Sequence, residues 1–390
     1  MAVKDLLSQR VKDIEPSGIR KFFDLASQVE DVVSLGVGEP DFDTPWRVSD
    51  EAIYAIQSGR TTYTENSGLL KLRQEICHYV KRHYYFDYDA TSECIVTVGG
   101  SEAIDLCYRS FINPGDEVII PVPTYVAYAP GVTLSGGVIK ELKLSGDNQF
   151  KVTPQALEAL ITPKSKMLIM NYPSNPTGGT MSYDDYALLV PIIKKHHLIV
   201  VSDEIYSELI YDNSSHYSLA NFDEIKDQVL VINGFSKAFA MTGWRLGYIL
   251  GNKEIIANML KIHQYTIMCA PIMAQYAGIE ALKHCDEEVA KMRSAYQARR
   301  NLIVKGFNDL GLPTHKPKGA FYIFPDITST GLSSEAFCEE LLAKQKVACV
   351  PGTAFGAAGE GYIRVSYAYS LEELNAALKR IKCFLEDIKK

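Results

Sequence analysis

Apolar runs alternate with amphipathic stretches through the middle of the chain. Seven apolar runs predict strands, at residues 94–98, 117–121, 138–142, 167–171, 198–203, 229–233 and 248–250. The stretches between them predict helices at 102–112, 125–133, 154–160 and 183–196, and a short helix after Glu204. Several strands are apolar throughout, which is typical of a mainly parallel sheet covered by helices on both faces.

The pattern on either side of this region predicts further elements. The strand at 248–250 leaves little room for a crossover helix, so we expect it to run antiparallel to its neighbour. Helices at 19–28, 48–58 and 69–82 and a strand at 32–35 precede the sheet. After a long helical region, a smaller α+β section is predicted, with strands at 319–324, 347–350 and 362–367 and helices at 334–345 and 371–389.

The length of 390 residues favours more than one domain. We expect a large domain over 46–285, which holds the seven-stranded sheet, and a small C-terminal domain over 286–390. The N-terminal segment, 1–45, is expected to pack with the small domain.

Composition narrows the classes of partner. A net charge of −7 gives no electrostatic reason to expect nucleic acid or an anionic membrane, and no apolar run is long enough to span a bilayer. The first 15 residues are charged and lack the apolar core of a signal peptide. Eight scattered cysteines without a C-x-x-C pair indicate reduced thiols in a cytoplasmic protein, and no histidine motif predicts a metal site.

Lys237 occupies an unusual position for a lysine. It follows the predicted strand 229–233 and a break at Gly234, and it stands among Phe235, Ala238 and Phe239. Burying an ammonium group is costly unless the charge is paired or removed. A bond between the amine and an aldehyde removes the charge, which gives the hypothesis that Lys237 carries a covalently bound group.

Chemically useful residues also follow the other strands, where ligands of an open parallel sheet bind. Gly100 and Ser101 lead into a helix whose first amides could hold a phosphate or simply form a turn. Tyr125 could be a ligand contact or a core aromatic. Asn175 lies between two prolines, and Asp203 could cap a helix or face a cation.

In this order on successive strand ends, these residues resemble the fold-type I pyridoxal phosphate enzymes, in particular the class I/II aminotransferases. The resemblance covers nearly the whole chain. Its strongest motifs lie at 171–178, 202–206 and 236–247, and matching stretches include GVGEPDFDTP at 36–45 and GYIRVSYA at 361–368. The sequence of these motifs is similar to that of aromatic amino acid aminotransferases and of acetyl-diaminopimelate aminotransferases. The resemblance implies an α/β fold with a mainly parallel seven-stranded sheet and a smaller α+β domain.

The resemblance also implies pyridoxal 5′-phosphate as cofactor and assigns residues to it. Lys237 matches the lysine that binds the cofactor aldehyde and carries the substrate proton, and Asp203 matches the acid at the ring nitrogen. Further matches are Asn175 and Tyr206 on the phenolic oxygen, Tyr125 stacked on the ring, and Gly100, Ser101, Glu102, Ser236 and Arg245 on the phosphate. Tyr63 matches a tyrosine that reaches the phosphate from a neighbouring subunit, which implies a homodimer.

Substrate contacts follow from the same resemblance. Arg364 matches the arginine that binds the substrate carboxylate, assisted by Gly38 and Asn175. Ile19 near the entrance favours apolar or aromatic side chains, whereas Arg20 could pair with an acidic substrate. At the position of Ser101, some aspartate-preferring relatives carry a lysine for the distal carboxylate of the substrate. The absence of this cation argues against a dedicated aspartate enzyme.

We therefore expect an aminotransferase that moves an amino group between an aromatic or other bulky amino acid and 2-oxoglutarate by a ping-pong mechanism. Its partners would be small molecules and a second copy of the chain. The alternatives are an acetyl-diaminopimelate or aspartate-type aminotransferase, a C–S lyase on the same fold, and a regulator that keeps the fold without catalysis.

Overall fold

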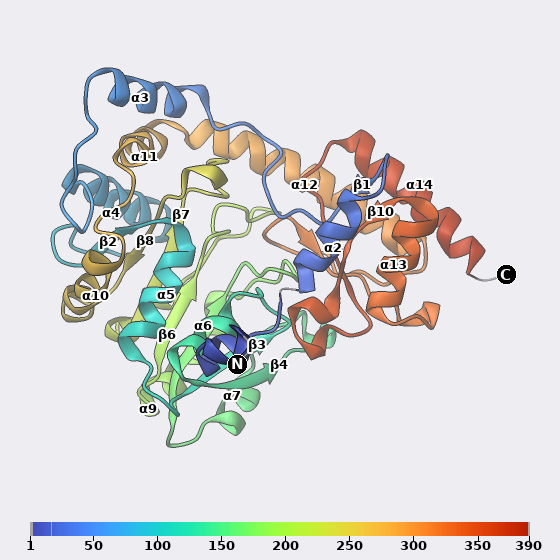
Figure 1. Cartoon of the computed structure of the whole chain (residues 1–390), viewed down its shortest axis with the longest axis horizontal. Coiled ribbons are helices and arrows are strands. Elements are labelled where there is room, and N and C mark those ends of the chain that lie inside the picture. Colours follow the sequence, from blue (N-terminus) through green and yellow to red (C-terminus); the bar gives the residue numbers. More distant parts are fainter. Residues whose placement is uncertain (1–2, 17, 389–390) are drawn as a thin grey trace.

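A seven-stranded sheet forms the centre of the larger unit of the molecule (Figure 1). The computed structural model describes residues 3–16 and 18–388. The strand order is β2-β8-β7-β6-β5-β3-β4. The strands are β2 (Cys94–Thr97), β3 (Glu117–Val122), β4 (Val138–Lys143), β5 (Ser165–Asn171), β6 (Ile199–Asp203), β7 (Val229–Gly234) and β8 (Gly247–Leu250). Only β8 is reversed, pairing antiparallel with both β7 and β2, so the predicted mainly parallel sheet with an antiparallel last strand is confirmed.

The central strands are mostly apolar because the sheet has a core on each face, whereas the edge strand β4 carries Lys140, Glu141 and Lys143 and is largely exposed. Val200 of β6 and Val231 of β7 pack into one cluster, whereas Val201 and Leu230 point into the other. The helices of this unit are α3 (Trp46–Gln57), α4 (Leu70–Tyr84), α5 (Gly99–Phe111), α6 (Tyr128–Ser135), α7 (Pro154–Leu160), α8 (Tyr183–Ala187), α9 (Val190–Lys195), α10 (Lys253–Thr266) and α11 (Ile272–His284).

Two helix predictions differ from the structure. The single helix expected over 183–196 is divided into α8 and α9, because Pro191 at the start of α9 has no amide to continue the preceding helix. The short helix expected after Glu204 is wrong. The chain there forms turns, in which the amide of Ser207 donates to the carbonyl of Glu204 and that of Leu209 to the carbonyl of Tyr206.

The smaller unit contains a three-stranded antiparallel sheet, in the order β11-β12-β9, and two helices. Its elements are β9 (Tyr322–Ile323), β10 (Val347–Ala348), β11 (Val350–Pro351), β12 (Ile363–Ser366), α13 (Ser334–Gln345) and α14 (Leu371–Asp387). The long helix α12 (Asp286–Asp309) runs from the larger unit to this one (Figure 1).

The N-terminal segment contacts both units. Within it lie α1 (Gln9–Lys12), α2 (Gly18–Ser27) and β1 (Val33–Ser34). β1 pairs parallel with β10 of the smaller unit, whereas Arg10 donates to the carbonyl of Leu134 at α6 in the larger one. The segment therefore passes across the boundary between the units. No helix in the described part of the chain is long and apolar enough to cross a membrane.

Candidate active site

A cavity of about 430 Å³ opens at the carboxyl ends of the parallel strands. Residues of both units line it. The predicted residues that it brings together are Ile19, Gly38, Gly100, Ser101, Tyr125, Asn175, Asp203, Tyr206, Ser236, Lys237, Arg245 and Arg364. Strand ends, a helix start and the N-terminal segment thus converge on one space, as expected for an open parallel sheet.

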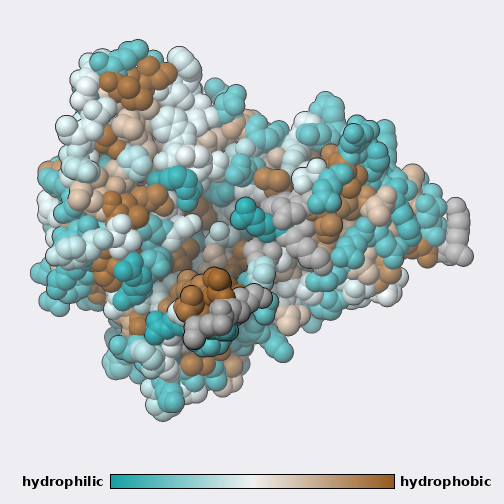
Figure 2. Space-filling model, in the orientation of Figure 1, coloured by the Kyte–Doolittle hydropathy of each residue, from teal (hydrophilic) through white to brown (hydrophobic). Residues whose placement is uncertain are grey.

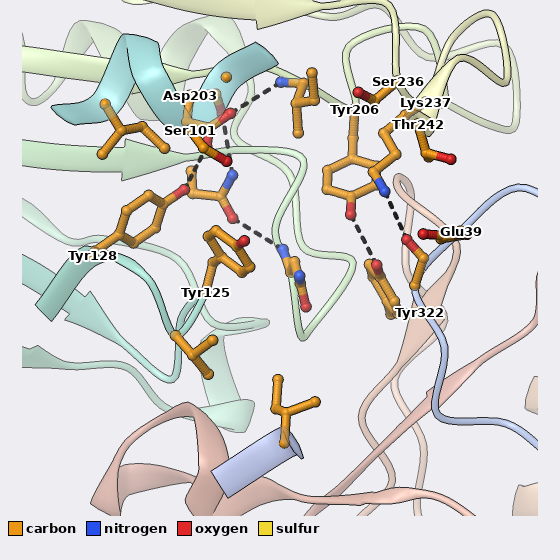
Figure 3. A pocket seen from close by; sticks show the side chains of 18 of the residues that line it. Glu39, Ser101, Tyr125, Tyr128, Asp203, Tyr206, Ser236, Lys237, Thr242 and Tyr322 are labelled. Atoms are coloured by element: carbon orange, nitrogen blue, oxygen red, sulfur yellow. Dashed lines mark hydrogen bonds between the residues drawn. The ribbon is translucent and has the colours of Figure 1, made fainter. Parts of the chain in front are cut away.

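Lys237 reaches the cavity from the loop that follows β7. Its Nζ donates to the carbonyl of Gly38 at 2.6 Å and lies 5.9 Å from the ring centre of Tyr206 (Figure 3). Burial lowers the pKa of Lys237 to about 8, while the charge of Glu39 acts in the opposite direction. An amine with this pKa is partly neutral near physiological pH, so it can act as a nucleophile or a proton carrier.

Asp203 ends β6 and is buried. The hydroxyl of Tyr128 donates to its Oδ2 at 2.6 Å, and the amide of Ile205 donates to its Oδ1 at 3.2 Å (Figure 3). Burial raises the pKa of Asp203 to about 6, although both hydrogen bonds act to lower it. Both donors are neutral, so the carboxylate keeps the capacity to pair with a cation from a bound molecule.

Arg364 extends from β12 toward the same cavity. Its Nη1 donates to Oδ1 of Asn175 at 3.1 Å, and its Nη2 donates to the carbonyl of Gly36. The Nε atom is buried and has no hydrogen-bond partner among the described residues. The ring of Tyr322 lies 4.6 Å from the guanidinium carbon. A buried guanidinium with an unused donor is suited to bind a carboxylate.

An anion cradle lies at the start of α5. The first amides of a helix lack partners within the helix and attract negative charge, and Gly100 and Ser101 supply them here. Arg245 closes the cradle. A Cβ atom on Gly99 would lie 2.6 Å from its Nη2, and Gly99 has a φ of +71°. Glycine is therefore required at this position for both the backbone and the arginine.

The tyrosine pair on the opposite side of the cavity is tightly packed. The hydroxyls of Tyr206 and Tyr322 are 2.8 Å apart (Figure 3). A Cβ atom on Gly38 would lie 2.2 Å from the Tyr322 hydroxyl, so Gly38 lets the backbone approach this pair.

Together these side chains fit pyridoxal phosphate. Lys237 offers an amine for an aldehyde, Asp203 a carboxylate for a protonated ring nitrogen, and the start of α5 a cradle for a phosphate. Arg364, which lines the same cavity, offers a guanidinium to the carboxylate of a second molecule.

Two of the residues predicted to bind the cofactor, Tyr63 and Glu102, do not line the cavity. Tyr63 is 80% exposed on the surface and does not line the cavity of its own chain. The carboxylate of Glu102 does not line the cavity either; it accepts hydrogen bonds from the amide of Val98 and from Nδ1 of His263. Ile19 lies at the cavity, half-buried, whereas Arg20 is exposed.

The sequence interpretation did not assign several residues of the cavity, among them Tyr128, Tyr322 and Glu39. Tyr128 follows Tyr125 by three residues, a helical spacing that could have marked it as lying on the same side. Glu39 follows the predicted Gly38 directly, and Tyr322 lies in the stretch KPKGAFYIFP at 316–325, which also matches the family, so both could have been considered as site residues.

Comparisons with known proteins identify the family of this chain. A family model described as aminotransferase class I and II matches residues 30–381. YugH of Bacillus subtilis, named as an aminotransferase without a stated substrate, is 51% identical over 379 residues, covering 97% of this chain and 98% of its own. An aspartate aminotransferase of Pyrococcus abyssi is 44% identical over 387 residues, covering 98% of this chain and 99% of its own.

Further similarities carry other substrate names. A Bacillus subtilis relative, provisionally named N-acetyl-LL-diaminopimelate aminotransferase, is 43% identical over 385 residues, covering 98% of this chain and 96% of its own. The solved structure of an aromatic aminotransferase from Pyrococcus horikoshii has a TM-score of 0.91 at 42% identity, covering 95% of this chain and 99% of that one. The chain belongs to the class I and II aminotransferases, a family of pyridoxal phosphate-dependent enzymes.

Proposed function

We propose that this aminotransferase prefers aromatic or other bulky amino acids and uses 2-oxoglutarate as acceptor in a ping-pong reaction. The observation that carries the preference is the lining of the cavity. Its lining includes Ile19, Val37, Ile104, Val126 and the ring of Tyr322. Among the described residues, its cationic lining groups are Lys237, Arg245 and Arg364, each of which has a role elsewhere in the site. A substrate with a distal carboxylate thus meets no further cation there.

A second cavity supports the same preference. It measures about 590 Å³ and shares Ser101, Ile104, Tyr125 and Val126 with the first. Its acidic lining residues are Glu15, Asp105 and Glu141. This space suits the far end of a long side chain, and its acidic groups disfavour a distal carboxylate.

The proposed residue roles follow the geometry. Bound pyridoxal phosphate supplies an aldehyde for amines and an electron-accepting ring. Lys237 would hold the aldehyde, and its amine, once free, would be placed to take the proton from the substrate Cα. Asp203 keeps the ring nitrogen protonated, and Arg364 with Gly38 and Asn175 orients the substrate carboxylate.

The remaining residues bind and orient the cofactor. Tyr125 would stack on the ring, and Asn175 and Tyr206 would donate to its phenolic oxygen. The main-chain amides of Gly100, Ser101 and Glu102 would bind the phosphate together with the side chains of Ser236 and Arg245, and the arginine would contribute a permanent positive charge.

We also propose a cytoplasmic homodimer. Figure 2 shows apolar residues gathered over α3, whose exposed side chains include Ile53 and Ile56. Tyr63 and Tyr265 are exposed by 80% and 89%. An interface over this side would cover these apolar groups and bring Tyr63 of the partner subunit to the phosphate.

A panel of amino donors with 2-oxoglutarate tests the substrate proposal. We expect phenylalanine, tyrosine and tryptophan to give higher kcat/KM values than aspartate. A higher value for aspartate would contradict the proposal and point to Arg20 as the distal contact. N-acetyl-diaminopimelate belongs in the panel because one relative bears that name.

The reaction type is tested separately. The enzyme is mixed with an amino acid alone, and the cofactor absorbance should change to that of its amine form. Release of pyruvate and ammonia from cystathionine, without any oxo acid, would instead favour a C–S lyase.

A further inference from the structure

A buried histidine lies behind the phosphate end of the site. His263 on α10 is fully buried, and its Nδ1 lies 2.6 Å from Oε1 of Glu102 on α5. The Nε2 atom of the same ring is also buried and has no hydrogen-bond partner among the described residues. Buried polar groups normally have partners, so the ring is held in place chiefly by its bond to Glu102.

The two residues join the ends of two helices. Glu102 belongs to the first turn of α5, directly after Ser101, and its Oε2 accepts from the amide of Val98 at 2.5 Å. His263 is in the last turn of α10, where its carbonyl accepts from the amides of Ile267 and Met268. The pair thus anchors the first turn of α5 to a neighbouring helix.

A carboxylate in the first turn of α5 can weaken the binding of a phosphate there. The first turn of α5 favours anions, and an unrestrained Glu102 carboxylate could compete for the same amides or repel the phosphate. In the structure, its two oxygens instead accept from Val98 and His263, and Glu102 does not line the cavity while Ser101 does.

We propose that His263 is a positioning residue that holds the Glu102 carboxylate away from the cofactor phosphate. With the carboxylate held back, the amides at the start of α5 face the anion without a competing negative charge. This inference rests on the proposed phosphate site, and it concerns the phosphate end of the cofactor only.

The test compares two cofactor forms on the apoenzyme, pyridoxal phosphate and pyridoxal, which lacks the phosphate. His263→Leu removes the donor at similar volume. We expect the dissociation constant for pyridoxal phosphate to rise about tenfold, while that for pyridoxal changes by less than about twofold.

Two further variants distinguish an effect of the Glu102 charge on phosphate affinity from an effect of the changed side-chain shape at position 263. In His263→Asn, the side-chain amide places a donor close to the position of Nδ1, so affinity should stay near that of the unmodified enzyme. In the double variant Glu102→Gln/His263→Leu, no carboxylate remains to repel the phosphate, so the tenfold loss should largely disappear. His216→Leu is the matched control, because His216 also bonds a buried glutamate, Glu204, which does not belong to α5.

Equal weakening of both cofactor forms by His263→Leu, or no weakening of either, would overturn the proposal. If that variant does not fold, Glu102→Gln alone decides: unchanged or tighter binding of pyridoxal phosphate supports the proposal, and selectively weaker binding contradicts it. Failure of the unmodified apoenzyme to bind either form would count against the proposed function instead.

Discussion

Burial sets the chemistry of single residues in this site. It lowers the pKa of Lys237 and raises that of Asp203, so both shifts favour the neutral form of the side chain. Reactive residues are commonly tuned in this way, and the tuning has a cost in stability.

The cost can be measured on the apoenzyme with Lys237→Met. The pKa of Lys237 is lower in the folded state, about 8 instead of 10.5, so its charge opposes folding below pH 8. This opposition fades as the pH rises from 8 to 10.5. We expect the variant to gain about 1–3 kcal/mol of unfolding free energy at pH 7, and to lose this gain above pH 10.5. Denaturant unfolding of the variant and the unmodified chain at pH 7 and above pH 10.5 measures this difference. An equal gain in unfolding free energy at the two pH values would show that the charge of Lys237 is not responsible.

The same substitution that increases stability should decrease activity. Lys237→Met removes the proton carrier, so kcat should fall by about 10²–10⁴-fold or more. The exposed Lys195, changed to methionine in the same way, is the control and should retain kcat. Retained activity in the Lys237 variant would exclude its proposed role.

Tyr128→Phe tests the support of Asp203. Loss of its hydrogen bond should raise the pKa of Asp203 above its value of about 6, so that more of the carboxyl is protonated near pH 6–7. We expect cofactor affinity to fall about tenfold at pH 6.5 and to recover at pH 8.5. Tyr108→Phe is the control, because the buried Tyr108 hydroxyl has no partner among the described residues. A loss that does not depend on pH would contradict this explanation.

At the level of secondary structure, the start of α5 determines the phosphate site. The helix begins at Gly99, whose φ of +71° disfavours a side chain, and a Cβ atom there would displace the Arg245 guanidinium from its present position. The site therefore depends on one backbone position as much as on its side chains.

Gly99→Ala tests this dependence. The new Cβ would meet the Arg245 guanidinium at 2.6 Å and displace it, so affinity for pyridoxal phosphate should fall by at least about tenfold. Gly115→Ala is the control. Gly115 also has a positive φ, +91°, but a Cβ there has nothing within 4 Å. Both variants should lose stability through backbone strain, and only Gly99→Ala should lose phosphate affinity.

At the level of the whole molecule, the site is built between two units. Lys237 and Asp203 come from the larger one, whereas Arg364 and Tyr322 come from the smaller one. The division into 1–45, 46–285 and 286–390 remains our proposal for the domains. Relative motion of the units would change the distance between cofactor and substrate groups.

Mixing two inactive variants tests the homodimer. If Tyr63 of the partner subunit binds the phosphate, a Lys237→Ala chain and a Tyr63→Phe chain together form one complete site in each mixed dimer. After unfolding and refolding together, we expect part of the cofactor affinity and activity to return. Each variant refolded alone should remain impaired, and no recovery in the mixture would mean that Tyr63 acts within its own chain or not at all.

The sequence by itself determined the element order and the chemistry of most site residues. All seven sheet strands were located, the central ones because a strand with a core on each face is apolar along most of its length. The motifs around Lys237, Asp203 and Asn175 identified the family before any contact was known. The failures were local, at Pro191 and after Glu204, where a proline and a series of turns decide the backbone.

Only the tertiary structure decided which distant groups support these residues. The bond from Tyr128 to Asp203 spans 75 positions of sequence, and that from His263 to Glu102 spans 161. The direction of the Glu102 carboxylate likewise depends on where α10 packs against α5. Periodicity records which side of an element is buried, whereas the partner of a buried polar group is set by packing between elements far apart in the chain.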